Sequence, residues 1–365
     1  MALKCGIVGL PNVGKSTLFN CLSNAQALAA NYPFATIEPN VGVVNVPDER
    51  LAKLTELVNP QRVVPTTVEI VDIAGLVAGA SKGEGLGNQF LGNIRDTHAI
   101  VHVIRCFEDD NVVHVSGNID PVRDKEIIDI ELQLKDLESV EKKMQRFEKL
   151  LKTGEREYKR GMEVLEVYRQ HLEAGKSART APVEEDDKRF IEDINLLTAK
   201  PVLYVCNVDE KAAANGNKYT RALEEAVKGE NAEVMLICAA MEADIAQLET
   251  YEERMEFLEA MGLSEPGINK LIKACYRLLN LLTYFTAGVK EVRAWTIKRG
   301  MKAPQAAGEI HSDFEKGFIR AEVIAYNDYV QYGSESAARD NGRLRVEGKE
   351  YTVADGDVMH FRFNV

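Results

Sequence analysis

The segment GLPNVGKST, residues 9–17, decides the fold of this chain. It matches the phosphate-loop pattern G-x-x-x-x-G-K-[ST], and it lies between an apolar run, Lys4–Leu10, and the helix-forming run STLFNCLSN. Glycines allow the backbone N–H groups of such a loop to turn toward phosphates, and the following helix adds the positive end of its dipole. The segment therefore predicts a nucleotide-binding α/β domain that begins with a strand, a loop and a helix.

The phosphate loop also predicts the roles of its side chains. We expect the ammonium group of Lys15 to bridge the β- and γ-phosphates of a nucleoside triphosphate, and the hydroxyl group of Ser16 to ligate Mg²⁺. The loop residues expected to contact the nucleotide are Asn12, Val13, Gly14, Lys15, Ser16 and Thr17.

Two downstream motifs fit the same chemistry. Asp72 lies near the end of the apolar run VEIVDIAG, where a carboxylate can hold Mg²⁺ through water and the N–H of Gly75 can reach the γ-phosphate. Thr36, within NYPFATIEPN, is expected to ligate Mg²⁺ when a triphosphate is bound; the alternative is an ordinary loop residue. The glycine-rich run Gly75–Leu91 is expected to reorder with the γ-phosphate.

The residue after DIAG bears on hydrolysis. Many GTPases place a water-orienting glutamine there, whereas this chain has Leu76, which cannot hydrogen-bond to water. Hydrolysis must then be organised by a monovalent cation such as K⁺ near Asn12, by backbone groups of the switch segments, or by a polar side chain from elsewhere. His114 is one such candidate catalytic residue, although a structural histidine is the interpretation favoured by the residue alone.

Short apolar, β-branched runs predict the sheet. They are Lys4–Leu10, Val41–Val46, Val68–Ile73, Ile100–Phe107, Pro201–Asn207 and Glu233–Cys238. Several precede helix-like segments, and this alternation is typical of a doubly wound, mostly parallel α/β sheet. We expect the nucleotide-binding domain to cover residues 1–120 and 198–280.

Residues 121–197 form a different kind of segment. A seven-residue apolar repeat runs through Ile130, Leu137, Met144 and Leu151, and a second apolar seam runs from Tyr158 to Leu172. Two antiparallel helices joined near Lys152–Glu155 would bury both seams. Residues 141–160 carry eight Lys/Arg and four Asp/Glu, so the end of this arm is locally basic. It is either a solvated charged face or a contact for nucleic acid or a protein partner.

Residues 281–365 predict a small β-grasp-like module. The strand-like segments are LLTYFTAGVKEVRAWTI, FIRAEVIAY, LRVEGKEYTV and VMHFRFNV, with turns at Glu347-Gly348 and Asp355-Gly356-Asp357. A helix is expected between the first two segments, at Ala303–Phe314.

The composition of the chain bears on nucleic-acid binding, on disulfides and on membrane insertion. The 365 residues carry a net charge of −12, which argues against non-specific nucleic-acid binding by the whole surface. The six cysteines are scattered without a CxxC pair, so reduced and buried thiols are expected. The start, MALKCGIVGL, is expected to be a strand rather than a signal peptide, and no apolar run approaches the ~20 residues of a membrane span. We expect a cytoplasmic protein with no membrane partner, and we favour a monomer although the sequence leaves the oligomeric state open.

The segment YVCNVDEK, residues 204–211, lies where a GTPase places the guanine-reading motif Asn-Lys-x-Asp. Asn207 is retained, but Val208 replaces the lysine and Glu210 replaces the aspartate. That aspartate accepts two hydrogen bonds from guanine, each worth roughly 1.5–3 kcal/mol. The longer Glu210 displaces the acceptor, so we expect ATP to be preferred, with Asn207 or a backbone carbonyl accepting from the adenine amino group. The alternative is a tolerant GTPase whose Glu210 bends into place.

These motifs closely resemble the YchF family of Obg-related P-loop ATPases, over essentially the whole chain. The stretches that carry the resemblance are GLPNVGKST, NYPFATIEPN, DIAGLVAGASKGEGLGNQFL, NVDE and the carboxy-terminal segment. The resemblance implies an Obg-type G-domain, an inserted coiled-coil arm and a carboxy-terminal TGS domain of β-grasp type. It also implies a preference for ATP over GTP and binding to the ribosome, particularly the large subunit.

The resemblance also assigns roles residue by residue. It places the Mg²⁺ ligands at Ser16 and Thr36, and the hydrophobic replacement of the catalytic glutamine at Leu76. The family's proposed catalytic histidine falls on His114. Its base-contacting loop falls on Asn207, Val208 and Glu210.

The leading hypothesis is a slow, ATP-dependent switch that binds the large ribosomal subunit, with rRNA contacted through the arm and the TGS domain. No arginine finger is evident, so slow intrinsic turnover is expected. One alternative is a P-loop kinase acting on a small metabolite, which would need an acceptor pocket and an Arg-bearing lid. Another is a binding scaffold whose nucleotide only stabilises the fold. The Thr36 switch and the DxxG loop favour the ATP-dependent switch over the kinase.

Overall fold

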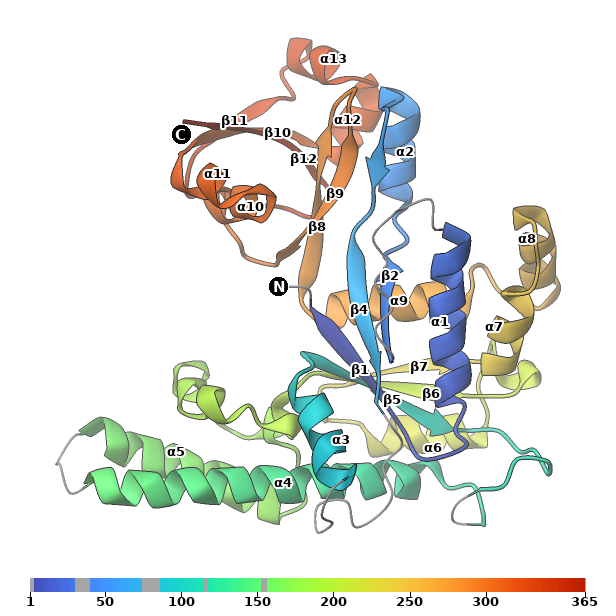
Figure 1. Cartoon of the computed structure of the whole chain (residues 1–365), viewed down its shortest axis with the longest axis vertical. Helices are drawn as coiled ribbons and strands as arrows, with labels where there is room; N and C mark the ends of the chain where they lie inside the picture. Colours follow the sequence, from blue (N-terminus) through green and yellow to red (C-terminus); the bar gives the residue numbers. More distant parts are fainter. Residues whose placement is uncertain (1–2, 30–39, 74–85, 115–116, 152–155, 365) are drawn as a thin grey trace. The chain divides into compact units, whose positions relative to one another are not determined.

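The structure is a computed structural model, and it describes residues 3–29, 40–73, 86–114, 117–151 and 156–364 (Figure 1). The chain forms two compact units. The first contains Met1–Val43 and Glu69–Leu271, and the second contains Val44–Val68 and Ile272–Val365. All the motifs predicted to bind nucleotide belong to the first unit.

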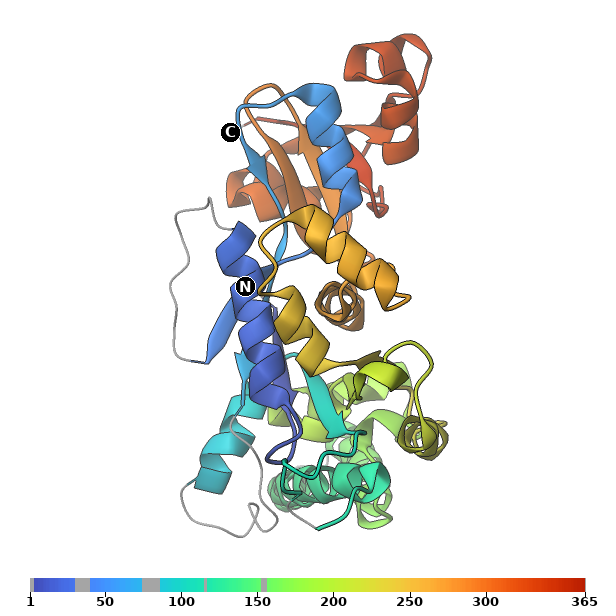
Figure 2. The same cartoon turned by 90° about the vertical axis from the view of Figure 1, so that its right-hand side faces the viewer.

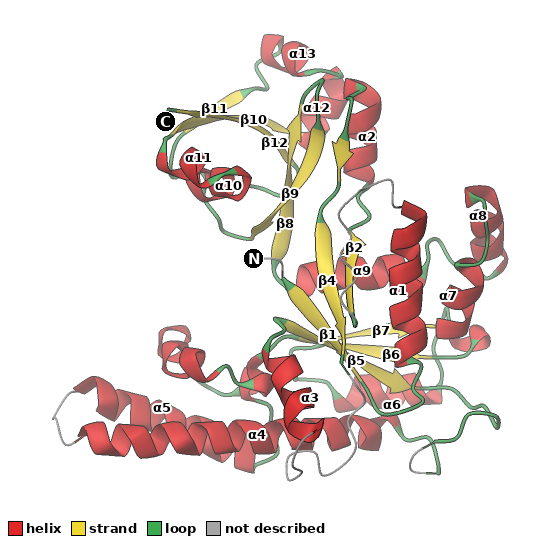
Figure 3. Ribbon diagram, in the orientation of Figure 1, coloured by secondary structure: helices red, strands yellow, loops and turns green. Residues whose placement is uncertain are grey.

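A six-stranded sheet with the order β2-β4-β1-β5-β6-β7 forms the centre of the first unit (Figure 3). Its strands are β1 Lys4–Val8, β2 Val41–Asn45, β4 Thr67–Asp72, β5 Ala99–Arg105, β6 Val202–Asn207 and β7 Glu233–Ile237. The five strands from β4 to β7 in this order pair in parallel, and every residue of β5 and β6 is buried. Continuous apolar runs are typical of such strands. The predicted doubly wound, mostly parallel sheet is therefore confirmed.

Helices cover both faces of this sheet. α1 (Lys15–Ala29) packs against α7 (Ala239–Ile245), whereas α4 (Pro121–Leu150) packs against β5 and α6 (Lys218–Ala226). Figure 3 shows α1 and α7 on one side of the strands and α4 and α6 on the other. Further helices are α3 (Leu86–Arg95), α8 (Tyr251–Ala260) and α9 (Gly267–Leu278).

Helices α4 and α5 (Arg156–Glu173) form the inserted arm, and they lie side by side in Figures 1 and 2. α4 begins where the side chain of Asp120 accepts a hydrogen bond from the N–H of Arg123, just ahead of a proline in the first turn. Phe147 in the last turns of α4 contacts Tyr158 near the start of α5, whereas Gln133 in the first half of α4 donates to the carbonyl of Gly175 after α5. The two helices therefore run antiparallel, as predicted.

The predicted heptad seam is correct only in its middle. Leu137 and Met144 pack against a core built around Val140, whereas Ile130 is 51% exposed and Leu151 is 37% exposed. The prediction is wrong at both ends because a heptad assumes one partner along the whole helix. The first turns of α4 instead pack against the sheet and α6, and this contact buries another face of the helix.

Asp136 ties the middle of α4 to the 3₁₀ helix Leu197–Ala199. Its carboxylate accepts hydrogen bonds from the N–H groups of Leu197 and Thr198, both at 2.7 Å, and from the Thr198 hydroxyl at 2.6 Å. Burial outweighs these bonds and raises the pKa of Asp136 to about 6. The link fixes the end of the insertion just before β6.

The second unit contains a mixed sheet with the order β11-β10-β12-β8-β9-β3. Its strands are β3 Val63–Val64, β8 Leu281–Ala287, β9 Val292–Lys298, β10 Phe318–Ala325, β11 Arg345–Glu347 and β12 Asp357–Phe363. β8 and β9 form an antiparallel pair, β12 runs parallel to β8, and α10 (Ala303–Ile310) packs against β9 and β10. This arrangement confirms the predicted β-grasp type. The unit also contains α2 (Glu49–Val58), α11 (Ser312–Lys316), α12 (Tyr326–Tyr332) and α13 (Glu335–Asp340).

The helix predicted at Ala303–Phe314 is interrupted at His311. This residue has an extended backbone (φ −163°, ψ 142°) between α10 and α11, and its Nδ1 accepts a hydrogen bond from the N–H of Asp313. A side chain that caps a new helix competes with continuation of the previous one. The strand predicted over LRVEGKEYTV is also shorter than expected, because only Arg345–Glu347 pairs with β10.

Residues 44–68 pack in the second unit. α2 contributes Leu51 and Leu54 to a core with Phe285 and Ile324, and β3 pairs with β9. The boundaries expected from the sequence instead place this segment in the nucleotide-binding domain. The difference arises because β2 and β4 flank the segment with ordinary strand patterns, and hydrophobic patterning does not show which core the intervening helix joins.

The described residues also test two expectations from composition. All six cysteines are buried and none belongs to a disulfide, as expected. Among the described helices, none combines the length and the apolar character that crossing a bilayer would require.

Candidate nucleotide-binding site

The phosphate loop lies between β1 and α1, and its backbone is shaped for close approach. Asn12 and Gly14 have positive φ angles of 63° and 93°. A Cβ atom on Gly14 would lie 2.2 Å from Nδ2 of Asn207, and one on Gly9 would lie 2.7 Å from the carbonyl oxygen of Val103. Both glycines are therefore required by the fold as well as by the expected ligand.

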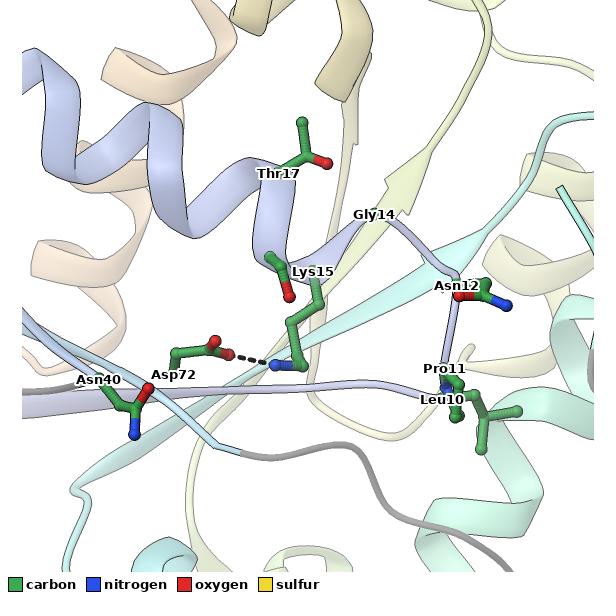
Figure 4. Close-up of a pocket in the computed structure, with 9 residues that line it drawn as sticks. Leu10, Pro11, Asn12, Gly14, Lys15, Thr17, Asn40 and Asp72 are labelled. Carbon is green, nitrogen blue, oxygen red and sulfur yellow. Dashed lines mark hydrogen bonds and ion pairs between the residues drawn. The ribbon is translucent and has the colours of Figure 1, made fainter.

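A cavity of about 590 Å³ opens at the loop (Figure 4). It is lined by Leu10, Pro11, Asn12, Gly14, Lys15, Ser16, Thr17, Asn40 and Asp72. The ammonium group of Lys15 forms an ion pair with the carboxylate of Asp72, and both side chains are largely buried. The structure thus brings together the predicted phosphate-binding lysine and two of the three predicted Mg²⁺ ligands, Ser16 and Asp72. Thr36, Gly75 and Leu76 lie outside the described residues.

A second cavity of about 660 Å³ continues the first, because Asn12, Gly14 and Thr17 line both. Its other walls are Phe107–Asp109, Val112, Asn207–Lys211 and Cys238–Ala240. The predicted base-reading loop, with Val208 and Glu210, therefore faces the same site as the phosphate loop. The site lies at the carboxyl ends of β1, β5, β6 and β7, where open α/β sheets bind ligands.

Asn207 has a structural task in this site. Its Nδ2 donates to the carbonyl of Val13 and its Oδ1 accepts from the N–H of Ala239, both at 2.9 Å, with the side chain buried. It thereby joins the base-reading loop to the phosphate loop and to the start of α7. The expectation that Asn207 could accept from the adenine amino group stays a prediction, because its oxygen holds one donor and has a second lone pair.

Val208 and Glu210 have opposite environments. Val208 is 2% exposed, and its N–H donates to the carbonyl of Ile237. Glu210 is exposed and begins a short 3₁₀ helix, Glu210–Ala212, which Asp209 caps by accepting from the N–H of Ala212 at 3.0 Å. The aliphatic side chain therefore belongs to the wall of the cavity, and the carboxylate stands at its edge.

The chain matches known proteins over its full length. A family model described as 50S ribosome-binding GTPase covers residues 4–149, and the YchF-GTPase carboxy-terminal model, described as a protein of unknown function, covers residues 281–364. The chain is 58% identical to the ribosome-binding ATPase YchF of Haemophilus ducreyi and 56% identical to that of Bacillus subtilis, with 100% of both chains covered in each case. This chain belongs to the YchF family.

A solved structure agrees with this assignment. The YchF GTPase of Schizosaccharomyces pombe superposes with a TM-score of 0.89 at 40% identity, and the match covers 99% of this chain and 97% of that one. The resemblance inferred from the motifs is confirmed, together with the G-domain fold.

Several residues that line this YchF site were not predicted from the sequence. Asn40 lines the phosphate cavity, while Phe107, Val112 and Cys238–Ala240 line the base cavity. Phe107 and Cys238 are each the last residue of a predicted strand. The rule that ligands bind at the carboxyl ends of parallel strands would have identified these two positions.

Arg105 holds the loop that carries Phe107. Its guanidinium group is 2% exposed and donates to the carbonyls of Phe107 (3.2 Å), Asp109 (3.1 Å) and Val112 (2.8 Å). Its Cζ also lies 4.5 Å from the centre of the Phe107 ring. A buried cation that binds three carbonyls of one loop fixes the shape of that wall of the cavity.

His114 lines neither cavity. Its Nε2 lies 2.8 Å from Oδ2 of Asp124, in the first turns of α4, and both side chains are almost fully buried. Val113, the preceding residue, accepts a hydrogen bond at 3.1 Å from Nδ2 of Asn12 in the phosphate loop. The predicted catalytic histidine is thus held beside the site rather than in it.

Proposed function

We propose that this YchF chain hydrolyses ATP to ADP and phosphate as a slow switch on the large ribosomal subunit in the cytoplasm. One observation carries the proposal: a continuous cavity joins an intact phosphate loop to an altered base-reading loop. The full-length relatives at 56–58% identity carry the name ribosome-binding ATPase, which supports the same reaction and partner.

Lys15 would stabilise the reacting phosphates. Its ion pair with Asp72 places the ammonium group at the phosphate cavity. A triphosphate offers Lys15 a more highly charged partner, so Asp72 would exchange the lysine for the metal side of the site. As water attacks the γ-phosphorus in line, Lys15 and the backbone N–H groups at the start of α1 would stabilise the developing negative charge.

The side chains at this cavity fit Mg²⁺. The hydroxyl of Ser16 and the carboxylate of Asp72 are the hard oxygen ligands that this ion prefers, and we propose Thr36 as a further ligand in the triphosphate state. When bound, Mg²⁺ would neutralise charge on the β- and γ-phosphates. A K⁺ ion near Asn12 would use Oδ1, because Nδ2 donates to Val113.

The base cavity supports adenine. Phe107, Val208 and the Ala239–Ala240 pair supply apolar surface for a purine ring. The acceptor for the 6-amino group would be the second lone pair of Asn207 Oδ1, whose first holds Ala239, or a backbone carbonyl or the carboxylate of Glu210. A guanine-specific site would instead need the shorter aspartate at residue 210.

The second unit supports a contact with rRNA. It contains 17 Lys/Arg and 15 Asp/Glu, whereas the first unit contains 28 and 42, so net charges of +2 and −14 are segregated along the chain. On β10, Glu322 has three guanidinium groups within 3.9 Å, those of Arg320, Arg339 and Arg362. Arg339 also pairs with Glu335, but two carboxylates cannot saturate the N–H donors of three guanidinium groups, and phosphates would be suitable acceptors.

The tip of the arm offers a second basic surface. Four cations there, Arg146, Lys149, Arg156 and Lys159, are exposed and form no ion pair within the described parts of the arm. We propose that the arm and the second unit both contact the ribosome, with the nucleotide deciding which contacts form.

Competitive binding of ATP and GTP, followed by co-sedimentation with ribosomes in each nucleotide state, tests the proposal. We expect tighter binding of ATP and a difference in sedimentation between the ATP and ADP states. Preferential binding of GTP would support the GTPase alternative. Equal sedimentation in every state, combined with intact binding of a Lys15→Ala variant, would support the scaffold alternative.

A further inference from the structure

The loop that carries His114 is attached at two points. Val113 accepts from Nδ2 of Asn12, a residue that lines both halves of the nucleotide cavity. His114 is joined to Asp124 of α4 at 2.8 Å. A short segment next to the phosphate loop is therefore connected directly to a helix of 30 residues.

The two carboxylate oxygens of Asp124 have different partners. His114 uses Oδ2 of Asp124, whereas Arg123 contacts the other oxygen, Oδ1, at 3.0 Å through Nη2. Arg123 is itself held by the side chain and the carbonyl of Asn118. If His114 left, Asp124 would keep its cationic partner, so opening would not strand a buried carboxylate.

We propose that Asp124 is a positioning residue that holds His114 outside the nucleotide cavity; we call the His114–Asp124 contact the latch. Bound ATP releases the histidine by drawing Asn12 away from Val113. The phosphate oxygens of ATP are charged acceptors, and they compete for the Asn12 amide better than the Val113 carbonyl does. This inference rests on the proposed hydrolysis and on His114 assisting it. Because Asp124 belongs to α4, which is one helix of the arm, a movement of the arm would also change the contact between Asp124 and His114.

The test compares four chains in steady-state ATP hydrolysis: wild type, Asp124→Asn, His114→Ala and the double variant. We expect Asp124→Asn to raise kcat several-fold with KM nearly unchanged, because His114 is already released. The double variant should match His114→Ala, since the gain requires the histidine. Asp129→Asn is the matched control: this residue pairs with Lys125 further along the same helix at 2.6 Å, and we expect its kcat to equal that of the wild type.

A second readout reports on the latch itself. In the wild type, a non-hydrolysable ATP analogue should increase hydrogen exchange in the Val113–His114 segment and in the first turn of α4. In Asp124→Asn the exchange should already be high without the analogue.

Each possible failure has a separate signature. A kcat for Asp124→Asn at or below the wild-type value, with ATP affinity unchanged, would overturn the latch. A gain that persists in the double variant would also overturn it, because the histidine would then be irrelevant. A wild-type chain that hydrolyses no ATP would instead refute the proposed function.

Discussion

At the scale of single residues, the site depends on contacts that serve the fold and the ligand together. Asn207 connects Val13 to Ala239, and Gly14 lies so close to Asn207 that no side chain fits. Val208 forms part of the cavity wall, while Glu210 remains exposed at its edge. The altered base-reading motif is thus a change in the cavity, while the framework that holds it is retained.

Replacing Gly14 by alanine should weaken nucleotide binding. The new Cβ would meet Nδ2 of Asn207 at 2.2 Å, and the φ of 93° adds strain of roughly 1–3 kcal/mol. Calorimetry with ATP should show a loss of affinity of at least about tenfold, which is what 1.4 kcal/mol represents. Gly92→Ala is the control, because Gly92 in α3 has open space around it and alanine should stabilise that helix by ~1 kcal/mol. Equal ATP affinities in the two variants would contradict this account.

The double variant Val208→Lys with Glu210→Asp should raise GTP affinity relative to ATP. The shorter carboxylate restores the acceptor for guanine, and hydrogen bonds to a charged group contribute roughly 1.5–3 kcal/mol each. Competition binding measures the ratio directly. The single variant Glu210→Asp tests the shorter carboxylate without changing the buried Val208. An unchanged ratio in both variants would mean that this loop does not choose the base.

At the scale of elements, α4 has different partners along its length. Its first turns contact the His114 loop, β5 and α6, and its second half pairs with α5. Asp136 ties its middle to the segment that leads into β6. The helix is consequently both a part of the nucleotide-binding unit and one half of the arm.

The contribution of Asp136 to the free energy of unfolding should fall as pH rises from about 4 to 6. Its folded pKa of about 6 lies above the ordinary value of 3.8, so the folded state binds the proton more tightly through this window. Its contribution to the free energy of unfolding is therefore largest at low pH and is lost as pH rises through 6. Asp136→Asn cannot titrate. In urea unfolding followed by helical circular dichroism, the wild-type advantage over Asp136→Asn should be larger at pH 4.5 than at pH 7 by about 2 kcal/mol. A pH-independent difference would count against the raised pKa.

At the scale of the whole molecule, the chain leaves the first unit within β2 and returns to it within β4. The intervening α2 and β3 complete the second unit, where Arg50 of α2 also forms an ion pair with Asp355 at 3.0 Å. The second unit therefore includes more than the module expected at residues 281–365. Two segments distant in sequence build one core.

Removing residues 281–365 should destabilise the chain as well as remove a partner surface. Leu51 and Leu54 would lose Phe285 and Ile324, and burying a leucine side chain contributes roughly 1.5–3 kcal/mol. We expect the truncated chain to aggregate or to melt at a lower temperature by scanning calorimetry. The same truncation with Leu51→Glu and Leu54→Glu should recover solubility. A truncated chain that melts like the full one would show that α2 does not depend on this core.

The sheet, the phosphate loop, the antiparallel arm and the family could be predicted from the residues alone, because each depends on local patterns: strand runs, glycine spacing and helical repeats. Only the tertiary structure decided which core α2 joins, which face of α4 is buried near the sheet, and that Asn207 and His114 are held by other residues. These features come from pairs of groups far apart in the chain. A periodic pattern states that a face will be buried, but the partner that buries it is chosen by packing.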